Sequence, residues 1–159
     1  MRLAVVAVGR LKDGPERELC QRYAGRIGEI GRSLGFSGPD LVELAESRAR
    51  REDDRKREEA DLIGARVPAG LLIVLDERGT SLPSPDFAAR LGRERDAGSP
   101  AASFVIGGAD GLDASLRDRA AVRLSFGALT IPHQIVRVLV LEQIYRALTI
   151  LSGHPYHRV

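Results

Sequence analysis

The stretch Leu71-Leu72-Ile73-Val74-Leu75-Asp76 decides the fold, because it places five apolar residues in succession and ends in an acid. A strand with one face in water alternates apolar and polar residues, whereas a strand buried on both faces is continuously apolar. Two further segments, Leu3–Val8 and Ala102–Ile106, have the same character. Three strands of this kind predict a mostly parallel sheet that is covered by helices on both faces.

Segments with helical spacing lie between these strands, so that strands and helices alternate along the chain. The spacing predicts helices over Pro15 to about Ile30, Ser84 to about Arg95, Asp113 (as the cap) to about Ala121 and His133 to Leu151, and short strands over Leu41–Leu44 and Val122–Phe126. Ser47 to Ala65 is highly charged, and Glu52–Lys56 and Asp53–Arg57 are spaced for pairs on an exposed helix. We expect an α/β fold with a mostly parallel sheet and helices on both faces, formed by a single domain over residues 1–159.

The composition, with 43% hydrophobic and 29% charged residues, is ordinary for a soluble globular protein. No apolar run approaches the roughly 18–20 residues that cross a bilayer, and Leu3–Val8 lacks the cleavage site of a signal peptide. Cys20 is the only cysteine, which excludes an internal disulfide and gives no metal cluster; we interpret it as a small buried hydrophobe. We therefore expect a cytoplasmic protein without a bound metal.

The segment Thr130–Val159 gathers groups that bind ligands and transfer protons. It holds all three histidines and two of the three tyrosines, and it ends in His154-Pro155-Tyr156-His157-Arg158-Val159. From Arg119 onward, Glu142 is the only acid against five arginines. A basic surface favours anionic partners such as the phosphate backbone of a nucleic acid, so this end of the chain is a candidate site.

Three strand ends carry candidate loops, because ligands bind at the carboxyl ends of strands in open α/β sheets. These ends are Leu75-Asp76, the glycine-rich Gly107–Gly111, and Phe126–Pro132. Glycine lets the backbone approach a ligand, and the last loop is small and apolar, so together they can line a cleft for a compact, partly apolar cofactor. The sequence contains neither a P-loop nor the dinucleotide fingerprint, and the glycine-rich loop taken alone favours a plain tight turn over a ligand loop.

Several motifs occur in order along the chain: Phe104–Leu112, Leu124–His133, Val136–Leu139, Glu142–Ala147 and the terminal His154–Arg158. Together with the opening strand Leu3–Gly9, they resemble the RlmH family, the bacterial 23S rRNA pseudouridine N3-methyltransferases of the SPOUT superfamily. The resemblance spans essentially the whole chain, strongly from residue 71 to 159 and weakly from 12 to 70.

This resemblance implies a C-terminal half with a trefoil knot that binds S-adenosyl-L-methionine in a bent shape, and it implies a homodimer. It implies cofactor contacts from Leu75, Gly107, Gly127, Ala128, Leu129, Thr130, Ile131 and Pro132. The implied substrate is a pseudouridine in helix 69 of 23S rRNA, met on the assembled 70S ribosome. The chain departs from the family at Ala109 and Asp110, where relatives often have proline and glutamate; the loss of proline's fixed φ leaves the turn looser.

Methylation of N3 requires the enzyme to align the base with the methyl group and to help remove the N3 proton. We expect Tyr156 to stack on the base or hydrogen-bond to it, Arg158 to hold a phosphate or stabilise negative charge on the base, and His157 or His154 to relay the proton. These are the candidate catalytic residues. For His133, which follows Pro132, a helix-start residue satisfied by backbone is the favoured interpretation.

Other charged residues have simpler interpretations. Glu142–Arg146 is spaced for a pair within a helix, whereas Arg137 is open to RNA phosphate or a partner subunit. The segment from Glu46 to Arg66 holds seven bases and seven acids, which favours a solvated helix face, although Arg48, Arg50 and Arg51 can still touch rRNA.

Three alternative functions remain open at this stage. A SPOUT enzyme that acts on tRNA or on a ribose 2′-oxygen stays within the superfamily, but the His-Pro-Tyr-His-Arg ending disfavours it. A non-catalytic ribosome-binding factor predicts ribosome affinity without cofactor binding. A flavodoxin-like nucleotide-binding protein has no phosphate loop to support it.

Overall fold

The computed structural model describes residues 1–157, which form one parallel sheet with helices on both faces. The strands are β1 (Arg2–Val8), β2 (Ser37–Leu44), β3 (Leu71–Thr80), β4 (Ala101–Ile106) and β5 (Val122–Leu124). They lie in the order β2-β1-β4-β3-β5, and every adjacent pair is parallel. The predicted α/β class is confirmed, and all the strand carboxyl ends share one edge of the sheet.

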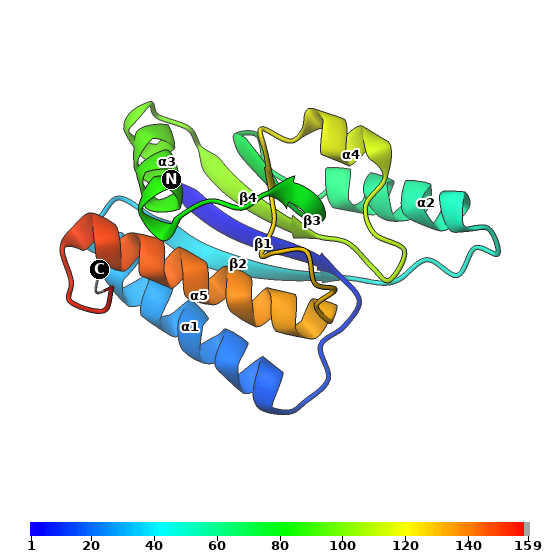
Figure 1. Ribbon diagram of the computed structural model, residues 1–159, viewed down its shortest axis with the longest axis horizontal. Helices are drawn as coiled ribbons and strands as arrows, with labels where there is room; N and C mark the ends of the chain where they lie inside the picture. Colours follow the sequence, from blue (N-terminus) through cyan, green and yellow to red (C-terminus); the bar gives the residue numbers. More distant parts are fainter. Residues whose placement is uncertain (158–159) are drawn as a thin grey trace.

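Five helices cover the sheet: α1 (Pro15–Ser33), α2 (Glu52–Gly64), α3 (Ser84–Asp96), α4 (Ala114–Arg119) and α5 (His133–Ser152). Figure 1 shows α1 and α5 side by side along one face, with α3 beside the end of α5, and α2 and α4 across the other face. Alternate residues of each strand therefore enter different cores. In β1, Leu3 and Val5 pack with α1, α3 and α5, whereas Val6 and Val8 pack toward α2 and α4.

The structure differs from the sequence prediction mainly at element boundaries. β2 begins at Ser37 rather than at residue 41, and α2 begins only at Glu52, after an extended segment that follows β2. β3 continues to Thr80, and β5 ends at Leu124 rather than at Phe126. These boundaries depend on pairing with neighbouring strands, which a local hydrophobic pattern does not contain.

Local pairs were predicted with mixed success. Asp113 caps α4, accepting a hydrogen bond from the Ser115 N–H at 2.8 Å, and Lys56 pairs with Glu52 at 2.5 Å. The predicted Asp53–Arg57 pair is wrong, because Arg57 instead lies 3.8 Å from Asp54. Positions three and four residues apart are both neighbours on a helix surface, so the spacing alone does not select the partner.

The bulged end of β3 wraps the end of β5. Leu124 lies opposite both Leu75 and Thr80, because the residues between those two bulge away from the ladder. The Ser125 N–H then donates to the Thr80 carbonyl at 3.1 Å. A Cβ at Gly79 would lie 2.5 Å from the Arg123 carbonyl oxygen, so this close approach requires glycine. After β5 the chain therefore passes against the end of β3 and crosses from the face covered by α4 to the face covered by α5. The expected knot requires a crossing of this kind.

None of the helices in residues 1–157 is long and apolar enough to span a bilayer.

Candidate active site

A pocket of about 690 Å³ opens at the carboxyl ends of β3, β4 and β5, where the sequence predicted three ligand-binding loops. Its volume lies within the range of about 300–1,000 Å³ that is typical of small-molecule sites. Its walls come from the start of α2, the second half of β3, the Gly107–Gly111 turn and the loop from Phe126 to His133. The three predicted loops therefore meet at one site.

The structure brings together seven of the eight residues that the family resemblance assigned to the cofactor. Those that line the pocket are Leu75, Gly107, Gly127, Leu129, Thr130, Ile131 and Pro132. Ala128 is exposed and does not line it. Leu129 is 83% exposed, which leaves a large apolar side chain at the pocket rim without a cover among residues 1–157.

Gly107 allows the glycine-rich turn at the pocket wall to close on itself. A Cβ at this position would lie 3.0 Å from the Gly111 carbonyl carbon and 3.0 Å from two carbons of the Leu112 side chain. Glycine is therefore required by the close approach of the two ends of the turn. The Gly111 N–H donates to the Gly108 carbonyl at 3.0 Å, which closes the turn in spite of alanine at position 109. The looser turn expected from Ala109 is thus held by its own backbone.

Asp110 connects this turn to α2. The Arg55 Nε donates to Asp110 Oδ2 at 2.6 Å, and Arg55 Nη2 donates to Oδ1 at 3.1 Å, which is a two-point pairing. The Arg55 guanidinium holds the pKa of Asp110 below its ordinary value. The same hydrogen bond raises the pKa of Arg55. Asp110, which stands where relatives often have glutamate, is therefore an ion-pair partner of α2.

Glu59 is a carboxylate that lies beneath the glycine-rich turn and is only 6% exposed. Its Oε1 accepts a hydrogen bond from the Ser47 N–H at 3.0 Å, and a Cβ at Gly108 would lie 3.0 Å from its Oε2. Burial raises the pKa of Glu59 above its ordinary value. This side chain packs the turn against α2 from below, and the charged sequence around it gave no sign of its burial.

Arg137 is 4% exposed, so the expectation that it meets RNA or a partner subunit is wrong. Its Nη2 donates to the carbonyl oxygens of Val8 at 2.8 Å and Gly9 at 2.7 Å, and its Nη1 donates to Glu43 Oε1 at 3.0 Å. Burial lowers the pKa of Arg137. Because it lies one turn after Pro132, Arg137 fixes the start of α5, and with it the pocket loop, to the ends of β1 and β2.

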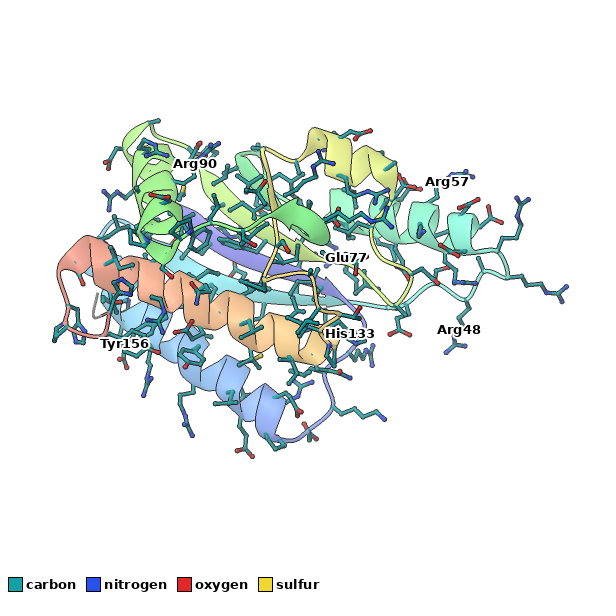
Figure 2. All side chains as sticks on the ribbon, in the orientation of Figure 1. Arg48, Arg57, Glu77, Arg90, His133 and Tyr156 are labelled. Carbon is teal, nitrogen blue, oxygen red and sulfur yellow. The ribbon has the colours of Figure 1, made fainter. Side chains whose placement is uncertain are left out.

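The C-terminal tail lies at the other end of α5. Figure 2 shows His133 at one end of this helix, by the pocket, and Tyr156 at the other. The Tyr156 hydroxyl donates to Glu142 Oε1 at 3.1 Å, and its ring packs edge-on against Tyr145, with ring centroids 4.8 Å apart. The predicted Glu142–Arg146 pair is confirmed at 2.5 Å, and the Arg146 guanidinium carbon lies 5.0 Å from the centre of the Tyr156 ring.

Tyr156 and His157 therefore do not line the pocket of their own chain. Burial, together with the neighbouring Tyr23 hydroxyl and the Glu142 carboxylate, raises the pKa of Tyr156, so the docked phenol is a hydrogen-bond donor at neutral pH. His157 Nδ1 lies 3.5 Å from Arg146 Nη1, and His154 Nδ1 accepts from the Tyr156 N–H at 3.2 Å. Arg158 lies outside the described residues. The half-buried His133, by contrast, lines the pocket.

The charges around the pocket nearly balance. Glu52 is paired with Lys56, and Glu77 lies 3.9 Å from Arg78, while Asp76 accepts a hydrogen bond from the Arg78 N–H at 2.9 Å. Residues 1–157 contain no group of three or more histidine, cysteine, aspartate or glutamate side chains that could hold a metal ion. The pocket therefore offers backbone groups, apolar side chains and balanced charge, which suit an organic ligand of low net charge.

Comparison with known proteins gives one family. The family model described as predicted SPOUT methyltransferase matches residues 1–157. The ribosomal RNA large subunit methyltransferase H of Rhodopseudomonas palustris strain HaA2 is 62% identical over 159 residues, covering 99% of each chain. The protein of the same name from Nitrobacter winogradskyi is 60% identical with the same coverage. A solved structure of a probable methylase family protein from Haemophilus influenzae Rd KW20 is 9% identical, with a TM-score of 0.49, over 99% of this chain and 70% of that one.

Proposed function

The chain belongs to the SPOUT methyltransferase family, and from this premise we propose that it transfers a methyl group from S-adenosylmethionine to large-subunit ribosomal RNA. The proposed target is N3 of a pseudouridine in helix 69 of 23S rRNA, on the assembled 70S ribosome. The whole chain acts as one methyltransferase domain, and a ribosomal substrate places the protein in the cytoplasm.

The observation that carries this proposal is the pocket at the carboxyl ends of β3, β4 and β5. S-adenosylmethionine fits the residues present: the volume of about 690 Å³ suffices, and the Gly107–Gly111 turn, which glycine at position 107 allows to close tightly, presents backbone to the pocket. The loop from Gly127 to Pro132 would hold the cofactor by its backbone, with Leu75 and Ile131 as apolar walls. When bound, this cofactor supplies an electrophilic methyl group on a sulfonium, so the reaction requires no metal.

The remaining chemistry belongs to the protein's own side chains. N3 of the base carries a proton and becomes nucleophilic only when that proton leaves, so a group must accept it and another must stabilise the anionic base. We assign these tasks to the tail, with His157 as the proton relay, Arg158 as the cationic partner of the base and Tyr156 as the stacking or hydrogen-bonding group. His133 lines the pocket and is the second imidazole that can reach the reacting base.

A homodimer explains how the tail can serve a pocket. Tyr156 contacts Glu142 and Arg146, and from His133 to Arg146 the α5 axis rises ~20 Å, so the docked tail lies far from its own pocket. Leu129 on the pocket rim is 83% exposed and Ile135 on α5 is 39% exposed, which leaves apolar surface beside the pocket for a second copy. We place the tail of one protomer at the pocket of its partner, in an arrangement with two-fold symmetry.

The first experiment is methyl transfer from labelled S-adenosylmethionine to 70S ribosomes that carry unmethylated pseudouridine. Wild-type protein is compared with a variant that lacks Tyr156–Val159. The expected result is label on the helix 69 pseudouridine with wild type, and its loss with the shortened variant while cofactor binding persists. Cofactor binding without any label on ribosomes would redirect the search to tRNA or another RNA.

A second experiment tests whether the partner's tail completes the site. Gly107→Val removes cofactor binding and Tyr156→Ala impairs the tail, so each homodimer alone is expected to be inactive. In an equal mixture, half of the dimers are heterodimers, and one of the two sites of each heterodimer combines an intact pocket with an intact partner tail. Mixing should therefore restore about a quarter of all sites. No recovery on mixing, with heterodimers demonstrated by a tag on one variant, would mean that the tail acts on its own pocket.

A further inference from the structure

The segment Glu46–Arg51, which connects β2 to α2, carries arginines that are not engaged with carboxylates. Arg48, Arg50 and Arg51 are all exposed, and within residues 1–157 none of them forms a salt bridge. Among the acids of α2, Glu52 pairs with Lys56 and Asp54 pairs with Arg57, while Glu58 and Glu59 accept hydrogen bonds from Ser47. No carboxylate of residues 1–157, on α2 or elsewhere, therefore pairs with the three arginines of the preceding segment.

Hydrogen bonds from α2 hold the backbone of this segment in place. The Ser47 N–H donates to the buried Glu59, and the Ser47 hydroxyl donates to Glu58 Oε2 at 2.5 Å. The Arg55 Nη1 donates to the carbonyl oxygens of Ala49 and Arg50, both at 3.1 Å. Because the backbone is fixed at both ends, the arginine side chains extend from a preformed support, which lowers the entropy lost when they bind a ligand.

The arginine segment lies at the same edge of the sheet as the cofactor pocket. A second hollow, of about 550 Å³, is lined by Gly9, Arg10 and residues 45–48, at the carboxyl ends of β1 and β2. Glu46 is the only acid in its lining, and Arg10 and Arg48 are exposed there. Figure 2 shows Arg48 on the segment that extends from the molecule at the end where His133 lies. An extended polyanion along this edge can meet the hollow and the pocket together.

Arg55 joins the arginine segment to the pocket. One guanidinium nitrogen, Nη1, binds the carbonyls of Ala49 and Arg50, while Nε and Nη2 bind Asp110 of the glycine-rich turn. Arg55 therefore connects the arginine segment directly to the pocket wall, in addition to the Ser47–Glu59 hydrogen bond beneath the same turn. A lysine at this position offers one nitrogen and cannot serve both sets of acceptors in this planar geometry.

We propose that Arg48, Arg50 and Arg51, together with Arg10, form a binding site for the phosphodiester backbone of the RNA substrate, and that Arg55 tethers this site to the cofactor pocket. Guanidinium groups suit phosphate oxygens because they present paired donors in a plane. This inference rests on the proposed function for the identity of the RNA, and it adds the surface that holds the RNA beside the pocket.

The test is the triple variant R48Q/R50Q/R51Q, with kcat and KM for unmethylated 70S ribosomes measured over a series of salt concentrations. On a single-stranded nucleic acid, the slope of log affinity against log salt falls by about 0.7 for each phosphate that the protein no longer neutralises, so three phosphates lower it by about 2. If these arginines contribute nothing at 1 M salt, that slope corresponds to a rise in KM of about fifty-fold near 0.15 M. The dissociation constant for S-adenosylmethionine should stay at the wild-type value.

The control variant R66Q/R93Q/R119Q removes the same charge from exposed arginines that lie before β3, β4 and β5, at the opposite edge of the sheet. It should keep the wild-type KM and salt slope. Equal losses in both triple variants, or none in R48Q/R50Q/R51Q, would overturn the proposal. Single substitutions, each expected to lower the slope by about 0.7, keep the test valid if the triple variant folds poorly. An inactive wild type with normal cofactor affinity would instead refute the proposed function.

The tether is tested by Arg55→Lys. Because Arg55 contacts both the arginine segment and Asp110, this variant should raise both the ribosome KM and the dissociation constant for S-adenosylmethionine, unlike R48Q/R50Q/R51Q. A wild-type value of either constant would overturn the tethering role.

Discussion

Replacing the buried Arg137 by methionine should lower the free energy of unfolding by about 3 kcal/mol. Methionine keeps an unbranched stem in the core but has no donor for the carbonyl oxygens of Val8 and Gly9, which the guanidinium binds at 2.8 and 2.7 Å. Each buried carbonyl left without a partner costs about 1–3 kcal/mol. Losing the contact with Glu43 adds little to this free-energy loss, because the Glu43 side chain is 30% exposed and still accepts a hydrogen bond from the Leu11 N–H at 2.9 Å.

The loss is measured by urea unfolding at a fixed protein concentration, since the stability of the proposed dimer would depend on concentration. For a chain of this length, 3 kcal/mol corresponds to a fall in Tm of about 10 °C. The affinity for S-adenosylmethionine should fall as well, because Arg137 fixes the start of α5 beside the pocket loop.

Arg93→Met, on the exposed side of α3, is the matched control and should change the stability by less than about 0.5 kcal/mol. A loss below about 1 kcal/mol for Arg137→Met would refute the reasoning, because it would mean that water or a neighbouring group satisfies both carbonyls.

Further predictions concern the pocket, a buried acid and the single thiol. Gly107→Ala should weaken S-adenosylmethionine binding at least about tenfold, since its Cβ would lie 3.0 Å from Leu112 and 3.0 Å from Gly111. Gly25→Ala is the control, because open space surrounds that position, and it should leave binding unchanged. Calorimetric titration measures both affinities. Burial raises the pKa of Glu59 above 4.5, so the folded state retains a proton that the unfolded chain releases, and stability falls as the pH rises from 4.5 through the folded pKa. Glu59→Gln should flatten that fall in urea midpoints measured over this range, and an unchanged pH profile would contradict the burial argument. Cys20 is 4% exposed and burial raises the pKa of its thiol, so a thiol reagent should modify it only on unfolding; rapid labelling of the native protein would show that α1 opens locally.

The strands and helices were predictable because their signals are local. The continuous apolar runs identify β1, β3 and β4, and the three strand ends that the sequence singled out do meet at the pocket. The glycine-rich turn was correctly placed, but the partner of Asp110 was not, because Arg55 lies 55 residues earlier in the chain. The position of the tail could not be predicted either, since Tyr156 packs on a helix surface that no sequence spacing specifies.

What the sequence by itself determined is the α/β class, the order of the elements and the loops that form the pocket, because hydrophobic periodicity and glycine placement act within a few residues. Only the tertiary structure decided which charges are buried and which pair with residues distant in the chain. Arg137 and Arg48 look alike as arginines in the chain, yet one binds the carbonyl of a residue 128 positions away and the other faces solvent. The cost of removing a charge from water depends on every element packed around it, and that environment exists only after the fold has formed.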